Sequence, residues 1–99
     1  MEEIINRQVA YVNNIHETLV TYTGKRLRIR ANMGRSKIIE REGVVTQAHN
    51  SLFIVETDEK RGRKARQSYQ YVDVLTGMVE LTNPEDEQPL FPALQQEIA

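Results

Sequence analysis

The hydrophobic positions of this chain follow two successive periods. Between residues 3 and 20, apolar side chains recur every three or four positions, which predicts one amphipathic helix. The members of this stripe are Ile5, Val9, Val12, Ile15 and Leu19. Thr21, Thr23 and Gly24 then favour a helix end, since glycine suits the positive φ angle of a cap.

From Lys25 the period changes to two, which is typical of a strand. In residues 25–31 apolar and basic side chains alternate, so one face is apolar and the other carries an arginine row, Arg26, Arg28 and Arg30. Further strands are predicted at 36–47, 52–55, 65–72 and 78–81, with a helical turn at 73–77. The apolar register slips at Gly43, which predicts a bulge or bend. Residues 52–55 are apolar on both faces, which predicts cover on both sides, with the helix on one of them.

One helix followed by five short strands predicts a mainly β fold. The expected architecture is a small five-stranded antiparallel SH3-like or Sm-like barrel behind an N-terminal α-helix, because closing the sheet removes exposed edges. The domain is expected to span residues 1–82. Residues 83–99, acidic and proline-containing, are predicted to leave it as a flexible tail.

Composition narrows the function classes. Ninety-nine residues suit one domain, and the absence of cysteine excludes disulfide scaffolds, thiolate metal sites and cysteine nucleophiles. His16 and His49 have no partner at ligand spacing, so neither a metal nor a cofactor is expected. No signal peptide or membrane span is visible, which predicts a cytoplasmic protein. Oligomeric state stays open.

Charge is segregated along the chain although the formal net charge is only −1. Residues 25–66 hold twelve of the thirteen bases against five acids, whereas residues 67–99 hold six acids and no base. A neutral total can therefore conceal a basic face.

The bases of the middle segment are the candidate contact residues for an acidic partner. The first group is Arg26, Arg28, Arg30, Arg35 and Lys37, and the second is Lys60, Arg61, Arg63 and Lys64. The arginine row could receive an acidic protein, a nucleic-acid backbone or the chain's own acidic residues 84–87. Residues 34–37 fit a phosphate-binding nest less well than a hairpin turn, since no P-loop spacing is present.

Tyr69 and Tyr71 form an aromatic pair at strand spacing. With the neighbouring bases they could stack on single-stranded nucleic acid, and the alternative is that both pack in the core. Neither the serines nor the histidines stand in a nucleophile or acid–base arrangement, so no enzyme is predicted.

Two segments, 24–37 and 68–76, resemble the Veg family of small cytoplasmic proteins of Gram-positive bacteria. The resemblance runs from about Ile15 to Leu81, and residues from Asn83 onward lie outside it. It implies an SH3-like or Sm-like barrel and a non-enzymatic role in stimulating biofilm formation through matrix-gene expression. We therefore expect a regulatory module that binds an acidic protein partner, such as a transcriptional regulator. The alternative is an Sm-like module that binds RNA or DNA through the same bases.

Overall fold

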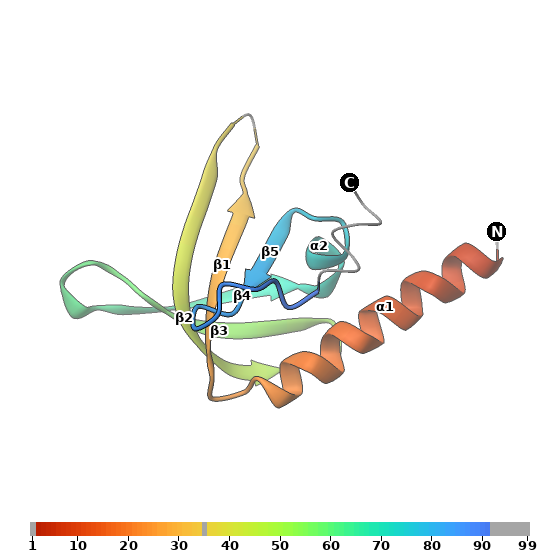
Figure 1. The fold of residues 1–99 in the computed structure, drawn as a ribbon, viewed down its shortest axis with the longest axis horizontal. Helices are drawn as coiled ribbons and strands as arrows, with labels where there is room; N and C mark the ends of the chain where they lie inside the picture. Colours follow the sequence, from red (N-terminus) through yellow and green to blue (C-terminus); the bar gives the residue numbers. More distant parts are fainter. Residues whose placement is uncertain (1, 35, 92–99) are drawn as a thin grey trace.

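The chain forms one long helix and five strands. The structure is a computed structural model that describes residues 2–34 and 36–91, and for residues 2–10 the backbone alone. The elements in order are α1 (Glu2–Thr21), β1 (Arg26–Asn32), β2 (Ile38–Ala48), β3 (Leu52–Asp58), a 3-10 turn (Lys60–Gly62), β4 (Lys64–Gln70), α2 (Tyr71–Leu75) and β5 (Val79–Thr82) (Figure 1). The predicted order of helix and strands is confirmed.

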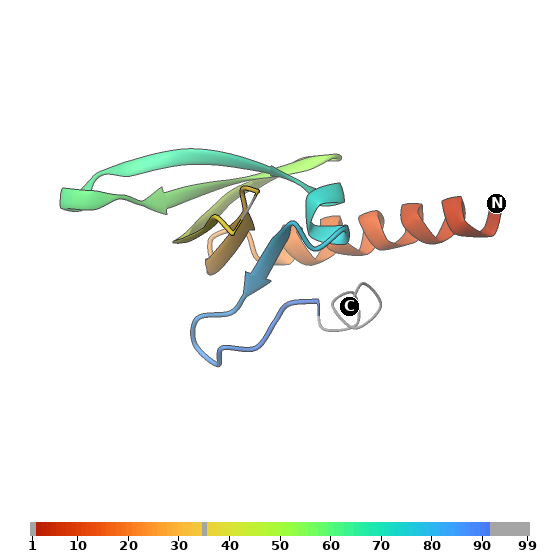
Figure 2. The same cartoon turned by 90° about the horizontal axis from the view of Figure 1, so that it is seen from above.

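The five strands make a single antiparallel sheet in the order β4-β3-β2-β1-β5. β4 and β5 lie on opposite sides of the β1–β2 hairpin (Figure 2), so the sheet is open at these two edges. The mainly β fold with an N-terminal helix is confirmed, whereas the predicted barrel closure is not observed. Assignment to the SH3-like or Sm-like barrels stays a prediction.

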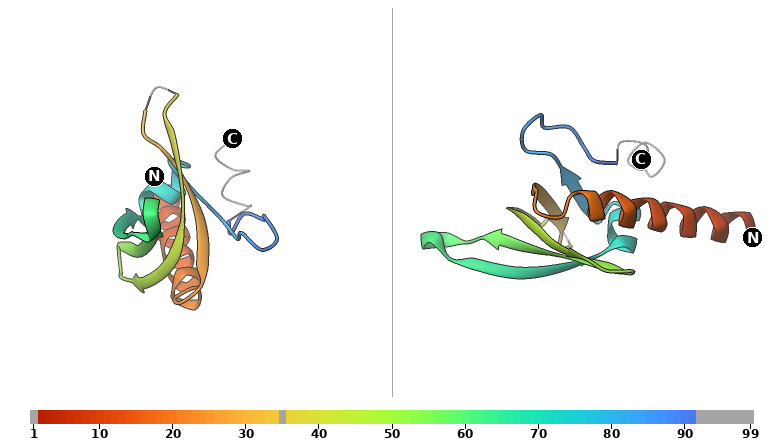
Figure 3. Two further views of the ribbon diagram at one scale, coloured as in Figure 1. Left: turned by 90° about the vertical axis from the view of Figure 1, so that its left-hand side faces the viewer. Right: turned by 90° about the horizontal axis from the view of Figure 1, so that it is seen from below.

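The core lies between the concave face of the sheet and the two helices. Ile15 and Leu19 of α1 are fully buried against a cluster that includes Phe53 and Val55 of β3. α1 crosses the end of the sheet and its N-terminal half extends beyond it (Figure 3). The prediction that residues 52–55 are covered on both sides is wrong for the second face, whose residues are only half-buried. The side chains of Ile5 and Val9 lie outside the described residues.

Two local predictions need correction. The register shift of β2 lies between Val45 and Gln47 rather than at Gly43. Gly43 instead lies where β2 approaches β3 so closely that an added Cβ would be 2.3 Å from the carbonyl oxygen of Glu56. Tyr71, predicted to continue the fourth strand, begins α2.

The acidic segment after β5 returns to the sheet. Thr82 forms an isolated bridge with Pro89, and the Leu90 amide donates to the carbonyl of Leu81 at 3.0 Å. Phe91 is buried in the core. The prediction that the chain leaves the domain at Asn83 is therefore wrong for residues 83–91. The physical reason is that Leu90 and Phe91 gain burial against the core. Residues 92–99 lie outside the described part.

Candidate interaction surface

The arginine row occupies the outer face of β1. Leu27, Ile29 and Ala31 are buried while the three arginines point away from the core, as the alternation of period two predicted. Antiparallel pairing then sets acidic neighbours beside the row. Arg28 pairs with Glu42 and Arg30 with Glu40 on β2, and Glu80 of β5 flanks Arg30 from the other side.

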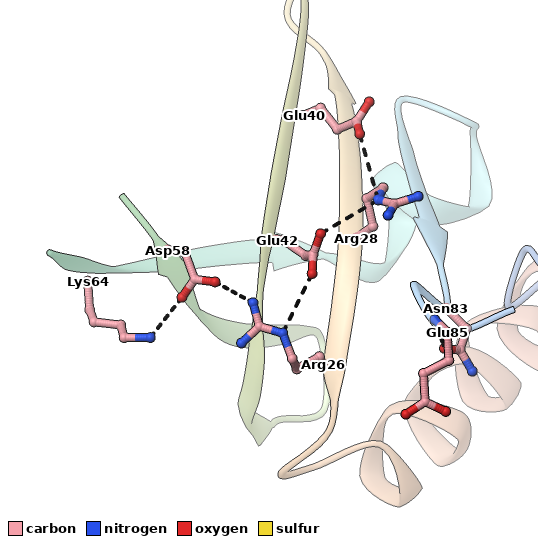
Figure 4. Close-up of polar contacts among 8 residues, drawn as sticks. All are labelled: Arg26, Arg28, Glu40, Glu42, Asp58, Lys64, Asn83 and Glu85. Carbon is pink, nitrogen blue, oxygen red and sulfur yellow. Dashed lines mark hydrogen bonds and ion pairs between the residues drawn. The ribbon is translucent and has the colours of Figure 1, made fainter. Parts of the chain in front are cut away.

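Ion pairs neutralise two of the three arginines (Figure 4). Arg26 contacts Asp58 and lies 3.6 Å from Glu42. Arg28 lies 3.7 Å from Glu40 and 3.8 Å from Glu42. Such exposed pairs contribute little stability one by one. Their consequence for recognition is larger, since the predicted basic face carries alternating charge rather than a single sign.

The returning acidic segment adds one more contact to the row. Asn83 accepts a hydrogen bond from the Glu85 amide at 2.9 Å, which holds a turn. Beyond that turn, Glu87 lies 3.3 Å from the guanidinium of Arg28. A cleft of about 460 Å³ lined by Arg26 and Glu85 separates the segment from the first arginine. The chain's own acids therefore cover part of the row.

The β3–β4 hairpin carries a second charge network beside its turn, where the end of β3 faces the start of β4. Lys64 lies 2.7 Å from Asp58, and Arg41 lies 2.7 Å and 2.8 Å from the two carboxylate oxygens of Glu59. The buried hydroxyl of Thr57 also donates to Glu59 at 3.1 Å. Sequence reasoning missed this network. The alternation of β2 could have indicated it: Gly43 and Val45 face the core, and Arg41, two positions earlier, lies on the same face of the strand.

Acidification is expected to weaken the folded state through these two carboxylates. Hydrogen bonds from Lys64 and then Arg26 lower the pKa of Asp58, and those from Arg41 and then Thr57 lower the pKa of Glu59. Their stabilisation is complete above the ordinary unfolded pKa of about 4 and is lost as the pH falls through the lower folded values. Thermal unfolding should therefore show a midpoint that falls on acidification, and less steeply in Asp58→Asn/Glu59→Gln. An unchanged slope in that variant would contradict this account.

The tip of the β3–β4 hairpin carries the uncompensated bases. Lys60, Arg61 and Arg63, here called the basic tip, are exposed, and their side chains make no ion pair or hydrogen bond with a described residue. The hairpin projects from the sheet on the side away from the N-terminus of α1 (Figure 1). Arg30 and Lys37 also lack an ion pair within residues 2–34 and 36–91. Arg35 lies outside the described residues.

The β1–β2 turn uses its own polar groups. The Lys37 amide donates to the Gly34 carbonyl at 2.7 Å, and the Gly34 amide donates to the Asn32 side chain at 3.0 Å. Two amides that a phosphate nest would need are thus engaged within the turn. The hairpin-turn interpretation of residues 34–37 is the one that fits.

The two tyrosines do not form an exposed pair. Tyr71 is fully buried, stacks on Phe53 with a centroid distance of 5.8 Å and donates its hydroxyl to the His49 carbonyl at 2.6 Å. Tyr69 is half-buried and stacks on Phe53 as well, with a centroid distance of 5.6 Å. Burial raises the pKa of both phenols. The stacking hypothesis is wrong for Tyr71 because no base can reach a buried ring.

Other chemistry is sparse in the described part of the chain. No group of three or more His, Asp or Glu side chains there could hold a metal ion. His16 packs against Tyr71 at 5.7 Å, and His49 lies 2.8 Å from Gln47. No described helix is long and apolar enough to cross a membrane.

The small open sheet, the N-terminal helix and the projecting basic hairpin define the class of protein. It is a mainly β domain that presents charged hairpins. The family described as "Biofilm formation stimulator VEG" matches residues 10–82. The chain belongs to this family, and the resemblance seen in residues 24–37 and 68–76 is confirmed. The family name assigns it a role in stimulating biofilm formation. No curated protein matches the chain.

Proposed function

We propose that this chain is a non-enzymatic regulatory binding module of the cytoplasm. It promotes biofilm formation through matrix-gene expression by holding an acidic protein partner, such as a transcriptional regulator, at the basic tip. The observation that carries the proposal is a contrast. Arg26 and Arg28 are paired with the chain's own acids, whereas the basic tip forms no ion pair with a described residue. Unpaired charges on a projecting hairpin attract a partner without first breaking internal contacts.

A protein partner is favoured over nucleic acid by two features. Tyr71 is buried and so supplies no stacking surface. The outer face of the sheet alternates in sign, because Glu40 and Glu42 of β2 lie beside the arginines of β1, and a phosphate backbone would meet these carboxylates. Free bases remain at the two hairpins, which is a small footprint for a nucleic-acid strand.

Removing the charges of the basic tip is expected to abolish function while the fold persists. In cells that lack their own copy, Lys60→Gln/Arg61→Gln/Arg63→Gln should leave matrix-gene transcription and biofilm mass at the level of the deletion. The loss of three exposed charge contacts with the acidic partner should weaken its binding about tenfold or more. The thermal midpoint should stay close to that of the unmodified chain, because these exposed side chains make no ion pair or hydrogen bond with a described residue.

The matched control removes charge from paired bases of the arginine row. Arg26→Gln/Arg28→Gln should keep most of the transcriptional response. If instead this variant loses the response and the tip variant keeps it, the arginine row is the contact surface. Protein purified at low salt should also show an ultraviolet absorbance ratio free of nucleic acid, and co-purifying RNA or DNA would replace the protein partner in this proposal.

A further inference from the structure

The second edge of β4 has no neighbour among the described residues, because β4 ends the sheet. The Glu59 amide donates to the Arg63 carbonyl and the Tyr71 amide to the Ser51 carbonyl, which sets the alternation of the β3–β4 ladder. Odd-numbered positions of β4 therefore bond to β3, and even-numbered positions direct their N–H and C=O groups to the open edge. These edge positions are Lys64, Arg66, Ser68 and Gln70.

A cleft lies beside this edge at the concave side of the sheet. It has a volume of about 290 Å³ and is lined on one side by Ser68 and Tyr69 of β4. Its lining also includes the apolar side chains of Met33, Ile39 and Met78, together with Arg41 of β2. Both methionines are exposed, Met33 at 61% and Met78 at 46%. Apolar side chains beside unpaired backbone groups are what an added strand uses for affinity and for specificity.

We infer that the β4 edge and this cleft together bind an extended segment of the acidic partner as an added strand. Charge selects the occupant. Arg66 and the basic tip lie toward the start of β4, whereas Asp73 lines the cleft near its end. The segment should therefore carry acidic residues at the hairpin end and one apolar anchor at the cleft, about three strand positions or 10 Å away.

This inference rests on the proposed function for the acidic character of the partner, and its test uses a defined probe. A random octapeptide library displayed on phage is selected against the full chain, and one enriched peptide is synthesised for fluorescence anisotropy. Enriched sequences should alternate in polarity and place an acidic residue about three positions from an apolar anchor. Selection without enrichment, or without this pattern, would overturn the inference.

Two variants locate the peptide. Ser68→Pro removes an edge N–H that bonds to no described residue, so it should weaken peptide binding about tenfold or more. The fold should persist, because an edge strand tolerates proline. Met33→Ser/Met78→Ser should weaken it similarly through the cleft, whereas Val20→Ser/Val72→Ser, which removes comparably exposed apolar side chains, should not. Equal binding to the unmodified chain and to both test variants would refute the site. A dimer of the free chain that Ser68→Pro dissociates would assign the edge to a second copy and equally refute it.

The basic-tip variant separates the two proposals. If Lys60→Gln/Arg61→Gln/Arg63→Gln binds the peptide normally while Ser68→Pro does not, the edge is the binding site and the role of the basic tip fails. If the peptide depends on the basic tip and ignores both β4-edge and cleft variants, the proposed function stands and the added strand does not.

Discussion

Gly43→Ala is expected to destabilise the protein more than any other single methyl group added to the sheet. The new Cβ would lie 2.3 Å from the Glu56 carbonyl oxygen and 2.7 Å from the Cα of Thr57. Both contacts are with backbone, so no side chain can rotate to relieve them, and β3 must move. Overpacking of this kind costs about 3 kcal/mol or more. For a domain of this size, thermal unfolding should show a midpoint lower by roughly 15 °C.

The position of Gly43 makes this a functional prediction as well. Its partners are Leu27 of β1 and Thr57 of β3, so it lies where β2 joins the arginine row to the strand that leads into the basic tip. Displacing β3 should also disturb the Arg26–Asp58 contact. Gly62→Asn is the control, because Gly62 has a φ of +73° that asparagine adopts at little cost and has open space around it. A Gly43→Ala midpoint within about 3 °C of the control would contradict the close approach.

Local periodicity made the secondary structure predictable. The stripe through Ile15 and Leu19 predicted α1 within one residue of its observed ends, since a helix needs only near neighbours to reveal its buried face. The alternation around Leu27 did the same for β1. The end of β4 was missed because Tyr71 continues the apolar pattern of the strand while its burial is completed by α1 and β3.

The candidate site depended on information that is not local. Arg26 and Asp58 are 32 positions apart, and they meet only because β1 pairs with β2 and β2 with β3 in one particular register. A shift of one residue would turn every one of these side chains to the other face. The positions of bases along the chain could therefore predict an arginine row but not its neutralisation. The exposure of the basic tip could be predicted from the sequence. Its importance could not, because it depends on the ion pairs that neutralise Arg26 and Arg28.

Tyr71→Ala is the second large effect that we expect. The ring is fully buried and stacks on Phe53 with an angle of 9° between the two planes, so truncation leaves a cavity between α1 and the sheet. Loss of a buried aromatic ring costs about 3–5 kcal/mol, a large part of the stability of a small domain. Denaturant unfolding should show a much lower midpoint with little folded protein at elevated temperature.

Removing single hydroxyl groups distinguishes the two roles considered for Tyr71, which are packing in the core and stacking on nucleic acid. Tyr71→Phe leaves the His49 carbonyl without the hydrogen bond it accepts at 2.6 Å, which should cost about 1–2 kcal/mol. Tyr69→Phe is the matched control, because the Tyr69 hydroxyl has no hydrogen-bond partner among the described residues, and it should be nearly neutral. Tyr71→Phe should not alter partner binding at the basic tip. If instead Tyr71→Ala unfolds no more readily than Tyr69→Ala and selectively abolishes binding of a single-stranded oligonucleotide, Tyr71 would be a contact residue. Its burial and its hydrogen bond to His49 both argue for the structural role.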